Sequence, residues 1–449
     1  MDKIIQMKNE NQIIKYVILV LDIIALTVFC IMAFMSVVEL ANYNVIWPIS
    51  LPTLWTKLDR LLIFVAFIKI YLYFDKDRKS SIIGLCLLCF ILLLKQLSQC
   101  DYVQIAALIV SMLGIRFEKI VNVYVSSVGV SLIITYLMAI LGIIPNIKEV
   151  TPWRRVESMY YMGFTGHNPP MALWLFFLLG LFCLLSKKKS AIRIVIVIAS
   201  MLMTILLFVA TDSNTSFIIA FGVSAFALLN FLLPDRIKNF LGKTLDFIFY
   251  PVMIFVPVIS FFITLVGICL YGKVGNTEGM TNTIFSRFMI IYWELKLSGL
   301  PMPFHHTREA DIGSVDFSYF LSYDLDSGMY DNVDYNLFRG LGAIKRGQLF
   351  GGSDIEYFNI LLFDGLMILV PYILLTMYLM YKAYKTKNHV LMVCIAASVF
   401  YGNFEALKSG YTAFQLFFVA LLSDLSGCRI IRKKRVLKRR RRVRRRESY

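Results

Sequence analysis

Long apolar runs alternate with short polar connections along the whole of this chain. Each run has about 17–25 residues, enough for one helix to cross the roughly 30 Å of hydrocarbon in a bilayer. We therefore expect an all-α polytopic membrane protein that forms a single integral membrane domain over residues 1–449. Twelve transmembrane helices are predicted, at residues 14–40, 58–74, 81–95, 102–115, 119–143, 169–186, 191–210, 215–233, 247–271, 356–381, 389–404 and 411–427.

Positive charge divides the connections into two alternating sets. Short cytoplasmic loops of membrane proteins carry an excess of Lys and Arg, so the basic set is predicted to face the cytoplasm. With an even number of spans, both termini are then cytoplasmic, and connections 144–168 and 272–355 lie outside. The basic set comprises "DKDRKS" (75–80), "RFEK" (116–119), "SKKKSAIR" (186–193), "PDRIKNFLGKTLD" (234–246), "YKAYKTKNH" (381–389) and the C-terminal tail.

Composition agrees with this pattern, because a chain with 58% hydrophobic residues is not a soluble domain. The net charge of +17 is concentrated in the tail at residues 428–449, which carries 13 Lys and Arg and one Glu. Such a run directly after a span favours anionic lipid headgroups, at about 1 kcal/mol per basic residue. Membrane lipids are therefore expected as partners of the tail, and nucleic acid is not.

The cysteines and histidines predict neither a disulfide framework nor a metal site. Most of the eight cysteines fall inside apolar runs, and none has zinc-ligand spacing with a histidine. The adjacent pair His305 and His306 would point in different directions on any regular element. We expect no metal and no cofactor.

The stretch "GHNPP" begins one predicted span on the outer side. Pro169 and Pro170 can start a helix, because the first N–H groups of a helix have no partner in the helix. Asn168 is the expected N-cap. A helix N-terminus also suits an anion, so His167 and Asn168 are candidate site residues. Simple capping beside a solvated histidine is the competing interpretation.

Other outer residues add to this group. Arg154 and Arg155 stand beside Trp153, and the planar guanidinium of arginine binds phosphate in a bidentate manner. The connection "ATDSNTSF" (210–217) places five consecutive polar residues at a membrane surface, which favours a polar pocket that includes Asp212 and Asn214.

The outer connection 272–355 is long, and loops of this length are usually functional or disordered. Its content of Tyr, Phe, Trp, Gly and Asp favours an ordered loop. Residues 282–299 have helical periodicity and many aromatic residues, typical of a helix that lies in the membrane interface, with Arg287 on its polar face. Asp354 and Tyr357 stand where the next span begins.

Four of these segments form an ordered pattern on the outer side. They are "RR…GFTGHNPP", "TDSNTSF", "SRFMIIYWELKLSGLPMPF" and "DIEYFNILLFDG". In their order and spacing over most of the chain, they resemble the O-antigen polymerase and ligase superfamily, in particular the capsular and exopolysaccharide repeat-unit polymerases of Gram-positive bacteria. Asn214 stands where that family usually has an arginine, which weakens an anion contact at this turn.

The resemblance implies a metal-independent glycosyltransferase at the outer face of a bacterial cytoplasmic membrane. Its donor would be a growing glycan on a polyprenyl diphosphate, and its acceptor would be one lipid-linked repeat unit. Other polysaccharide-assembly proteins would be partners. A ligase of the same superfamily is an alternative, and a lipid-linked glycan flippase or transporter is the main competitor from another class. Transporters often contain internal repeats and broken spans, which this sequence does not show.

The requirements of glycosyl transfer from a diphosphate suggest roles for the residues on the outer side. Without a metal, arginines must stabilise the negative charge that grows on the leaving diphosphate, and a carboxylate or imidazole must handle the proton of the acceptor hydroxyl. The catalytic candidates are His167, Asp354 and Asp212. The substrate-binding candidates are Arg154, Arg155, Arg287, Asn168, Asn214 and Tyr357.

Overall fold

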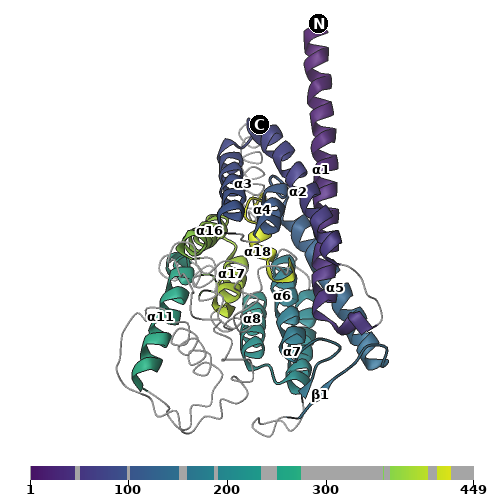
Figure 1. The fold of residues 1–449 in the computed structure, drawn as a ribbon, viewed down its shortest axis with the longest axis vertical. Helices are drawn as coiled ribbons and strands as arrows, with labels where there is room; N and C mark the ends of the chain where they lie inside the picture. The colour runs from purple at the N-terminus through teal and green to yellow at the C-terminus, as the bar shows by residue number, and fades with distance from the viewer. Residues whose placement is uncertain are drawn as a thin grey trace, which may run out of the picture.

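The computed structural model describes residues 2–45, 51–98, 102–150, 159–186, 191–233, 250–274, 357, 360, 365–402 and 412–425, and most of these residues are helical (Figure 1). The α-helices are α1 (Asp2–Leu40), α2 (Leu51–Tyr73), α3 (Arg78–Ser98), α4 (Val103–Ser111), α5 (Phe117–Ile140), α6 (Asn168–Leu185), α7 (Ile192–Thr211), α8 (Asn214–Leu232), α10 (Tyr250–Met253), α11 (Val256–Val274), α16 (Leu366–Lys385), α17 (His389–Tyr401) and α18 (Leu416–Val419). The remaining elements are the 3-10 turns η1 (Asn42–Val45) and η6 (Thr412–Phe414) and the short strands β1 (Lys148–Glu149) and β2 (Met159–Tyr160).

Within these ranges, seven helices are long and apolar enough to cross a membrane. They are α1 from Gln12, α3, α5, α6, α7, α8 and α16. Two further apolar helices, Val256–Val266 within α11 and His389–Tyr401, are shorter. The predicted all-α fold with several membrane-spanning helices is therefore confirmed and indicates a protein embedded in a membrane, whereas the count of twelve spans stays a prediction.

Two of the predicted spans do not form long helices. In the range 102–115, α4 has nine residues and a length of about 14 Å, less than half of a bilayer. In the range 411–427, the described residues 412–425 contain only η6 and the four-residue α18. Nearly all of residues 412–425 are buried, and irregular backbone is tolerated at membrane depth only where protein surrounds it. Neither range is one continuous transmembrane helix.

These two short segments are joined by backbone hydrogen bonds. The N–H of Asp424 donates to the carbonyl of Ile115 at 2.8 Å, and the N–H of Phe117 donates to the carbonyl of Asp424 at 3.0 Å. Helix α18 packs on α4. The short C-terminal segment therefore completes the backbone pairing of the turn that precedes α5.

The packing of α5 against α1 shows which face of a helix meets the protein. Ser127 donates to the carbonyl of Cys30 at 2.6 Å, and buried Ser131 and Thr135 follow at four-residue spacing. The opposite face exposes large apolar side chains such as Ile133 and Leu137. Small and hydroxyl residues between helices with an apolar face outside are typical of membrane bundles. The face of α5 that points away from α1 is thus suited to contact lipid.

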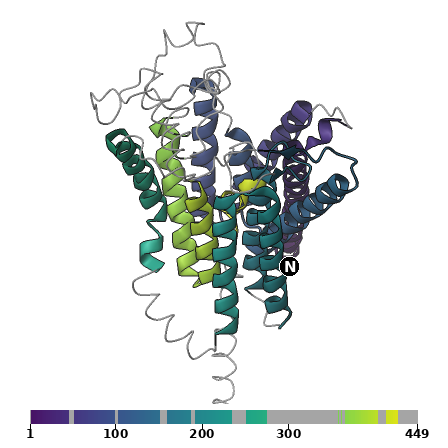
Figure 2. The same cartoon turned by 90° about the horizontal axis from the view of Figure 1, so that it is seen from below.

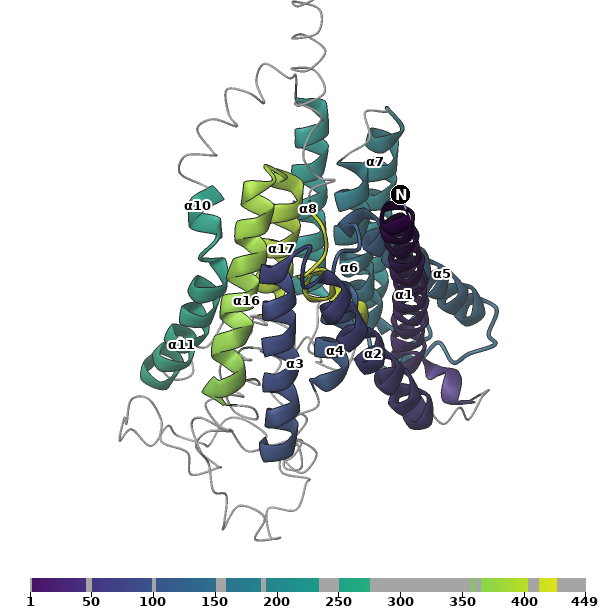
Figure 3. The same ribbon diagram turned by 90° about the horizontal axis from the view of Figure 1, so that it is seen from above.

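Helix α6 packs on α5, and α8 and α17 pack on α6. Figures 2 and 3 show α8, α17 and α16 side by side, with α11 beside α16, and contacts between α8 and α17 and between α16 and α17 confirm this order. The N-terminal part of α1 extends beyond the other helices (Figure 1). The β1–β2 hairpin lies near the ends of α1 and α7 (Figure 1), and β2 contacts α7.

Candidate functional site at the hairpin end of the bundle

The β1–β2 hairpin brings an imidazole and a carboxylate together just before α6. The Nδ1 atom of His167 lies 3.9 Å from Oε2 of Glu149, and the Tyr161 hydroxyl donates to the same oxygen at 2.7 Å. The side chains of His167 and Glu149 are 19% and 38% exposed, so neither side chain is fully buried. A carboxylate beside one ring nitrogen orients an imidazole and stabilises the imidazolium that forms when it accepts a proton. We name these three residues the His167 group.

Local backbone geometry fixes the His167 group. The register of the hairpin sets Glu149 opposite Met159. The side chain of Asn146 accepts a hydrogen bond from the N–H of Met162 at 2.9 Å. Gly163 follows with φ of +87°, and a Cβ there would lie 2.7 Å from Cδ1 of Ile144. Only glycine fits this close approach without strain.

The helix start at α6 differs from the expectation that Asn168 is its N-cap. The N-cap position belongs to His167, and Asn168 is already helical, with no side-chain cap at this end. An N-cap side chain accepts from the second or third N–H of the helix. Those positions are Pro169 and Pro170, which have no N–H. The same two prolines leave this N-terminus with few donors for an anion, so His167 is the stronger functional candidate here.

Asp212 ends α7 in an unusual backbone conformation. Its φ of 50° and ψ of 30° are left-handed, and its N–H donates to the carbonyl of Phe208 at 2.8 Å. The residue is 6% exposed. Among the described residues its carboxylate has no hydrogen-bond or ion-pair partner. Its carboxylate oxygens are not fully buried, so this position is a candidate for accepting a hydrogen bond from a substrate.

The turn after Asp212 contains two more polar side chains with different partners. The amide of Asn214 donates to the backbone carbonyl of Asp212 at 3.5 Å, so it supports the turn itself. Ser213 donates to the hydroxyl of Ser216 at 3.3 Å, and Ser216 shares a hydrogen bond of 3.0 Å with the Tyr401 hydroxyl from α17. Sequence reasoning missed Tyr401, because a tyrosine near the end of an apolar run is ordinary.

The structure brings some of the predicted residues to one end of the bundle and buries another. Since β2 contacts α7, the His167 group and Asp212 belong to the same end of the bundle. Tyr357 is fully buried and packs edge-to-face on Tyr372 of α16, with ring centroids 5.8 Å apart. It occupies a core position. The predicted residues Arg154, Arg155, Arg287 and Asp354 lie outside the described residues.

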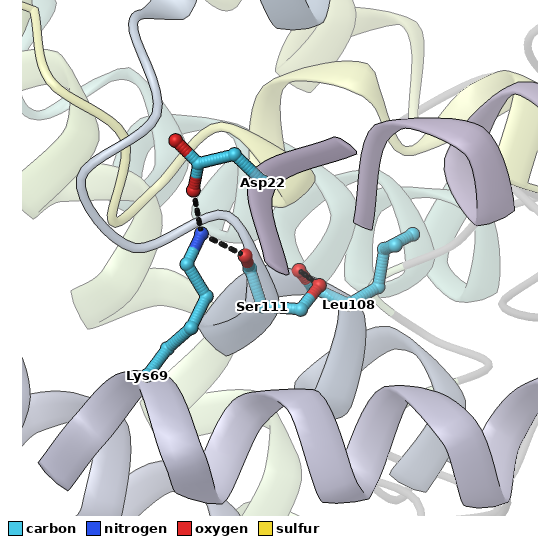
Figure 4. A network of polar contacts seen from close by, with 4 residues as sticks. All are labelled: Asp22, Lys69, Leu108 and Ser111. Carbon is cyan, nitrogen blue, oxygen red and sulfur yellow. Dashed lines mark hydrogen bonds and ion pairs between the residues drawn. The ribbon is translucent and has the colours of Figure 1, made fainter. Parts of the chain in front are cut away.

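A second polar group, which sequence reasoning also missed, lies far from the hairpin. Nζ of Lys69 in α2 lies 2.6 Å from Oδ1 of Asp22 in α1 and donates to the carbonyl of Ser111 at 2.7 Å, and the three side chains can be followed in Figure 4. The Lys69 side chain is fully buried. Asp22 lies 18 residues before the end of α1, about 27 Å along the helix. Charged residues inside two predicted spans were the available signal.

The described part of the chain contains no cluster of three or more His, Cys, Asp or Glu side chains that could hold a metal ion. No family model, curated protein or solved structure matches this chain. A function must therefore be argued from the residues of this chain.

Proposed function

We propose that this protein is a glycosyltransferase that joins polyprenyl-diphosphate-linked oligosaccharide repeat units into a polysaccharide at the outer face of the cytoplasmic membrane. The observation that carries the proposal is the His167 group, a partly exposed acid–base group at the start of a membrane helix. Its position at the same end as buried Asp212 and the resemblance of four outer segments to repeat-unit polymerases support the same conclusion.

The reaction needs a base and a charge stabiliser. A hydroxyl oxygen of the acceptor sugar forms a bond to the anomeric carbon of the donor, and the bond from that carbon to the diphosphate oxygen breaks. The electron pair leaves with the polyprenyl diphosphate. The proton of the hydroxyl passes to the imidazole of His167, and Glu149 stabilises the resulting charge. No redox step occurs.

The leaving diphosphate requires positive charge in the absence of a metal. We assign this role to Arg154, Arg155 and Arg287. The first two lie in the connection between β1 and β2, the hairpin that also carries Glu149. The proposed cations Arg154 and Arg155 are therefore close in the sequence to the proposed base, His167. A ligase, which transfers the finished glycan to a different acceptor, would use the same chemistry.

A lipid-linked glycan transporter is the second candidate. The buried pair Asp22–Lys69 favours it, because charges inside membrane helices often mark ion or substrate pathways. Against it, Lys69 is bound by two partners, a carboxylate and a helix-terminal carbonyl, which is the arrangement of a structural clamp.

Substitution of His167 tests the proposal. In cells that lack the native gene, His167→Ala and His167→Gln should abolish polymer while the protein remains abundant, because a general base contributes about 10²–10⁴-fold to rate. Polymer length is read on gels, and protein is measured in isolated membranes. His389→Gln is the control, because His389 stacks on Tyr250 at another site. Full-length polymer from both His167 variants would refute the role of His167.

A further inference from the structure

Most buried hydroxyls next to the candidate site are satisfied within their own helix. Ser200, Thr204 and Thr211 of α7 and Ser224 of α8 each donate to the carbonyl four residues earlier, at 2.6–2.8 Å. Such bonds fix each hydroxyl on its own helix, and of these four only the Thr204 hydroxyl has a partner in another helix within the described part of the chain, because it accepts from Nε1 of Trp174 at 2.9 Å. A buried hydroxyl that does not bond the carbonyl four residues earlier is therefore an exception near this site.

Ser213, Ser216 and Tyr401 depart from this pattern. Their hydroxyls form a chain, with 3.3 Å from Ser213 to Ser216 and 3.0 Å from Ser216 to Tyr401. All three residues are at most 3% exposed. A hydroxyl can rotate and either donate or accept, so a chain of hydroxyls can rearrange its protons around a ligand.

Helix capping does not explain this chain. Ser213 is the N-cap residue of α8 and Ser216 is three residues later, the spacing at which a cap normally forms. Yet Ser213 makes no side-chain cap, and its hydroxyl meets the Ser216 hydroxyl instead. The Ser213 hydroxyl therefore bonds the Ser216 hydroxyl and not a backbone N–H of α8.

Asp212 precedes this chain directly and supplies a second, independent observation. It is 6% exposed and its backbone is left-handed, and no described residue binds its carboxylate, whose oxygens are not fully buried. Strained backbone conformations concentrate at functional sites. A carboxylate only accepts hydrogen bonds, so it is suited to a ligand that donates them.

We infer that Asp212, Ser213, Ser216 and Tyr401 form a subsite that binds the hydroxyl groups of the acceptor sugar, named here the acceptor subsite. The inference rests on the proposed function and deepens it. The negative charge of Asp212 would repel a diphosphate, so this subsite is suited to the acceptor sugar and not to the donor's leaving group. Tyr401 is its new member, a residue from α17.

Packing connects the acceptor subsite to the helix that follows the His167 group. The ring of Tyr401 packs edge-to-face on Phe176 of α6, with centroids 5.7 Å apart. Since His167 is the N-cap residue of α6, this helix carries the proposed base at its start and a wall of the subsite at Phe176. A sugar held by the subsite would therefore lie beside the helix that presents the base.

The test uses the purified full-length protein in detergent micelles and measures binding of one probe. The probe is the oligosaccharide that mild acid releases from the lipid-linked repeat units of the producing cell. Tyr401→Phe and Ser216→Ala should each weaken binding about tenfold, which equals about 1.4 kcal/mol for the loss of one hydrogen bond. Asp212→Asn should weaken binding at least as much.

Two matched variants exclude a general effect of losing a buried hydroxyl. Ser224→Ala lies on the same helix as Ser216 but removes a hydroxyl that bonds only its own helix. Tyr124→Phe removes a buried tyrosine hydroxyl that donates to the carbonyl of Ala413. Both should bind the probe as the wild type does.

The results separate this inference from the proposed function. Unchanged binding in Tyr401→Phe, Ser216→Ala and Asp212→Asn would overturn the acceptor subsite, and so would equal losses in Ser224→Ala and Tyr124→Phe. Polymer formation is measured for the wild type and for a strain without the gene. If both strains make the same polymer, the proposed function itself is wrong, whatever the binding result.

Discussion

The contact between His167 and Glu149 is electrostatic, because 3.9 Å is too long for a hydrogen bond. The carboxylate accepts a true hydrogen bond from Tyr161 at 2.7 Å, which holds it in place beside the imidazole. The pair is thus arranged so that Glu149 acts through its charge on His167. In the proposed mechanism, Glu149 is a positioning residue and His167 is the catalytic one.

Glu149→Gln is expected to lower the rate of polymer formation by about tenfold, less than the loss expected for His167→Ala. Glutamine keeps the shape and can still accept from Tyr161, so only the charge beside the imidazole is lost. Initial rates in membranes supplied with lipid-linked repeat units are the measurement. Tyr161→Phe leaves the charge intact and should lose less activity. A Glu149→Gln rate equal to that of the wild type would show that the carboxylate has no role.

Sequence patterns reveal some of these residues and cannot reveal others. His167 and Asp212 are visible because polar residues at the mouth of an apolar run are unusual. Glu149 is not visible, because its place beside His167 depends on the register of two-residue strands. Tyr401 meets Ser216 across 185 residues, and that pairing follows from the packing of α17 on α8.

At the scale of elements, α4 depends on a charged clamp. The helix has nine residues, and its terminal carbonyl at Ser111 accepts from Lys69 of α2, which also pairs with Asp22 of α1. A cation at the C-terminus of a helix is favourable, and the last carbonyls of a helix need donors. Three helices are therefore joined at one ammonium group.

Removing one partner of this pair should destabilise the protein strongly. Lys69→Met is expected to lower the free energy of unfolding by about 3 kcal/mol, because it leaves the Asp22 carboxylate unpaired and mostly buried. The double variant Asp22→Asn/Lys69→Met should recover much of this loss, since no charge remains. Thermal unfolding in detergent micelles gives both values.

Lys57→Met on the exposed face of α2 is the control and should unfold as the wild type does. If the double variant is no more stable than Lys69→Met alone, the pair is not a structural clamp. A transport role for the charges would then gain support.

Hydropathy predicts the long helices well but cannot distinguish them from buried irregular backbone. The predicted span 169–186 closely matches α6, because its apolar run is continuous and starts at prolines. The range 411–427 has a similar apolar content, yet its described residues fold as turns and two short helical elements. Hydropathy measures how strongly a side chain prefers an apolar environment. Lipid and a protein core both provide such an environment, so hydropathy alone does not distinguish them.

At the scale of the whole molecule, hydrogen bonds join connections that are predicted to lie on the same side of the membrane. The N–H of Asn42 donates to the carbonyl of Gly163 at 2.8 Å, which joins two connections predicted to lie outside. Lys382 donates to the carbonyls of Leu421 and Ser423 at 2.8 and 3.1 Å, at the end that the basic connections share. This grouping agrees with the alternation of charge. Which end faces the cytoplasm stays a prediction from the Lys and Arg distribution.

Reconstitution of the full-length protein into liposomes tests the central claim most directly. The liposomes contain lipid-linked repeat units from the producing cell in both leaflets, and no nucleotide sugar or divalent metal is added. The account predicts that wild-type protein converts these units into a ladder of longer lipid-linked glycans, and that His167→Ala protein does not. If the wild-type protein moves repeat units across the bilayer and forms no longer glycans, the protein is a transporter and the polymerase account is wrong.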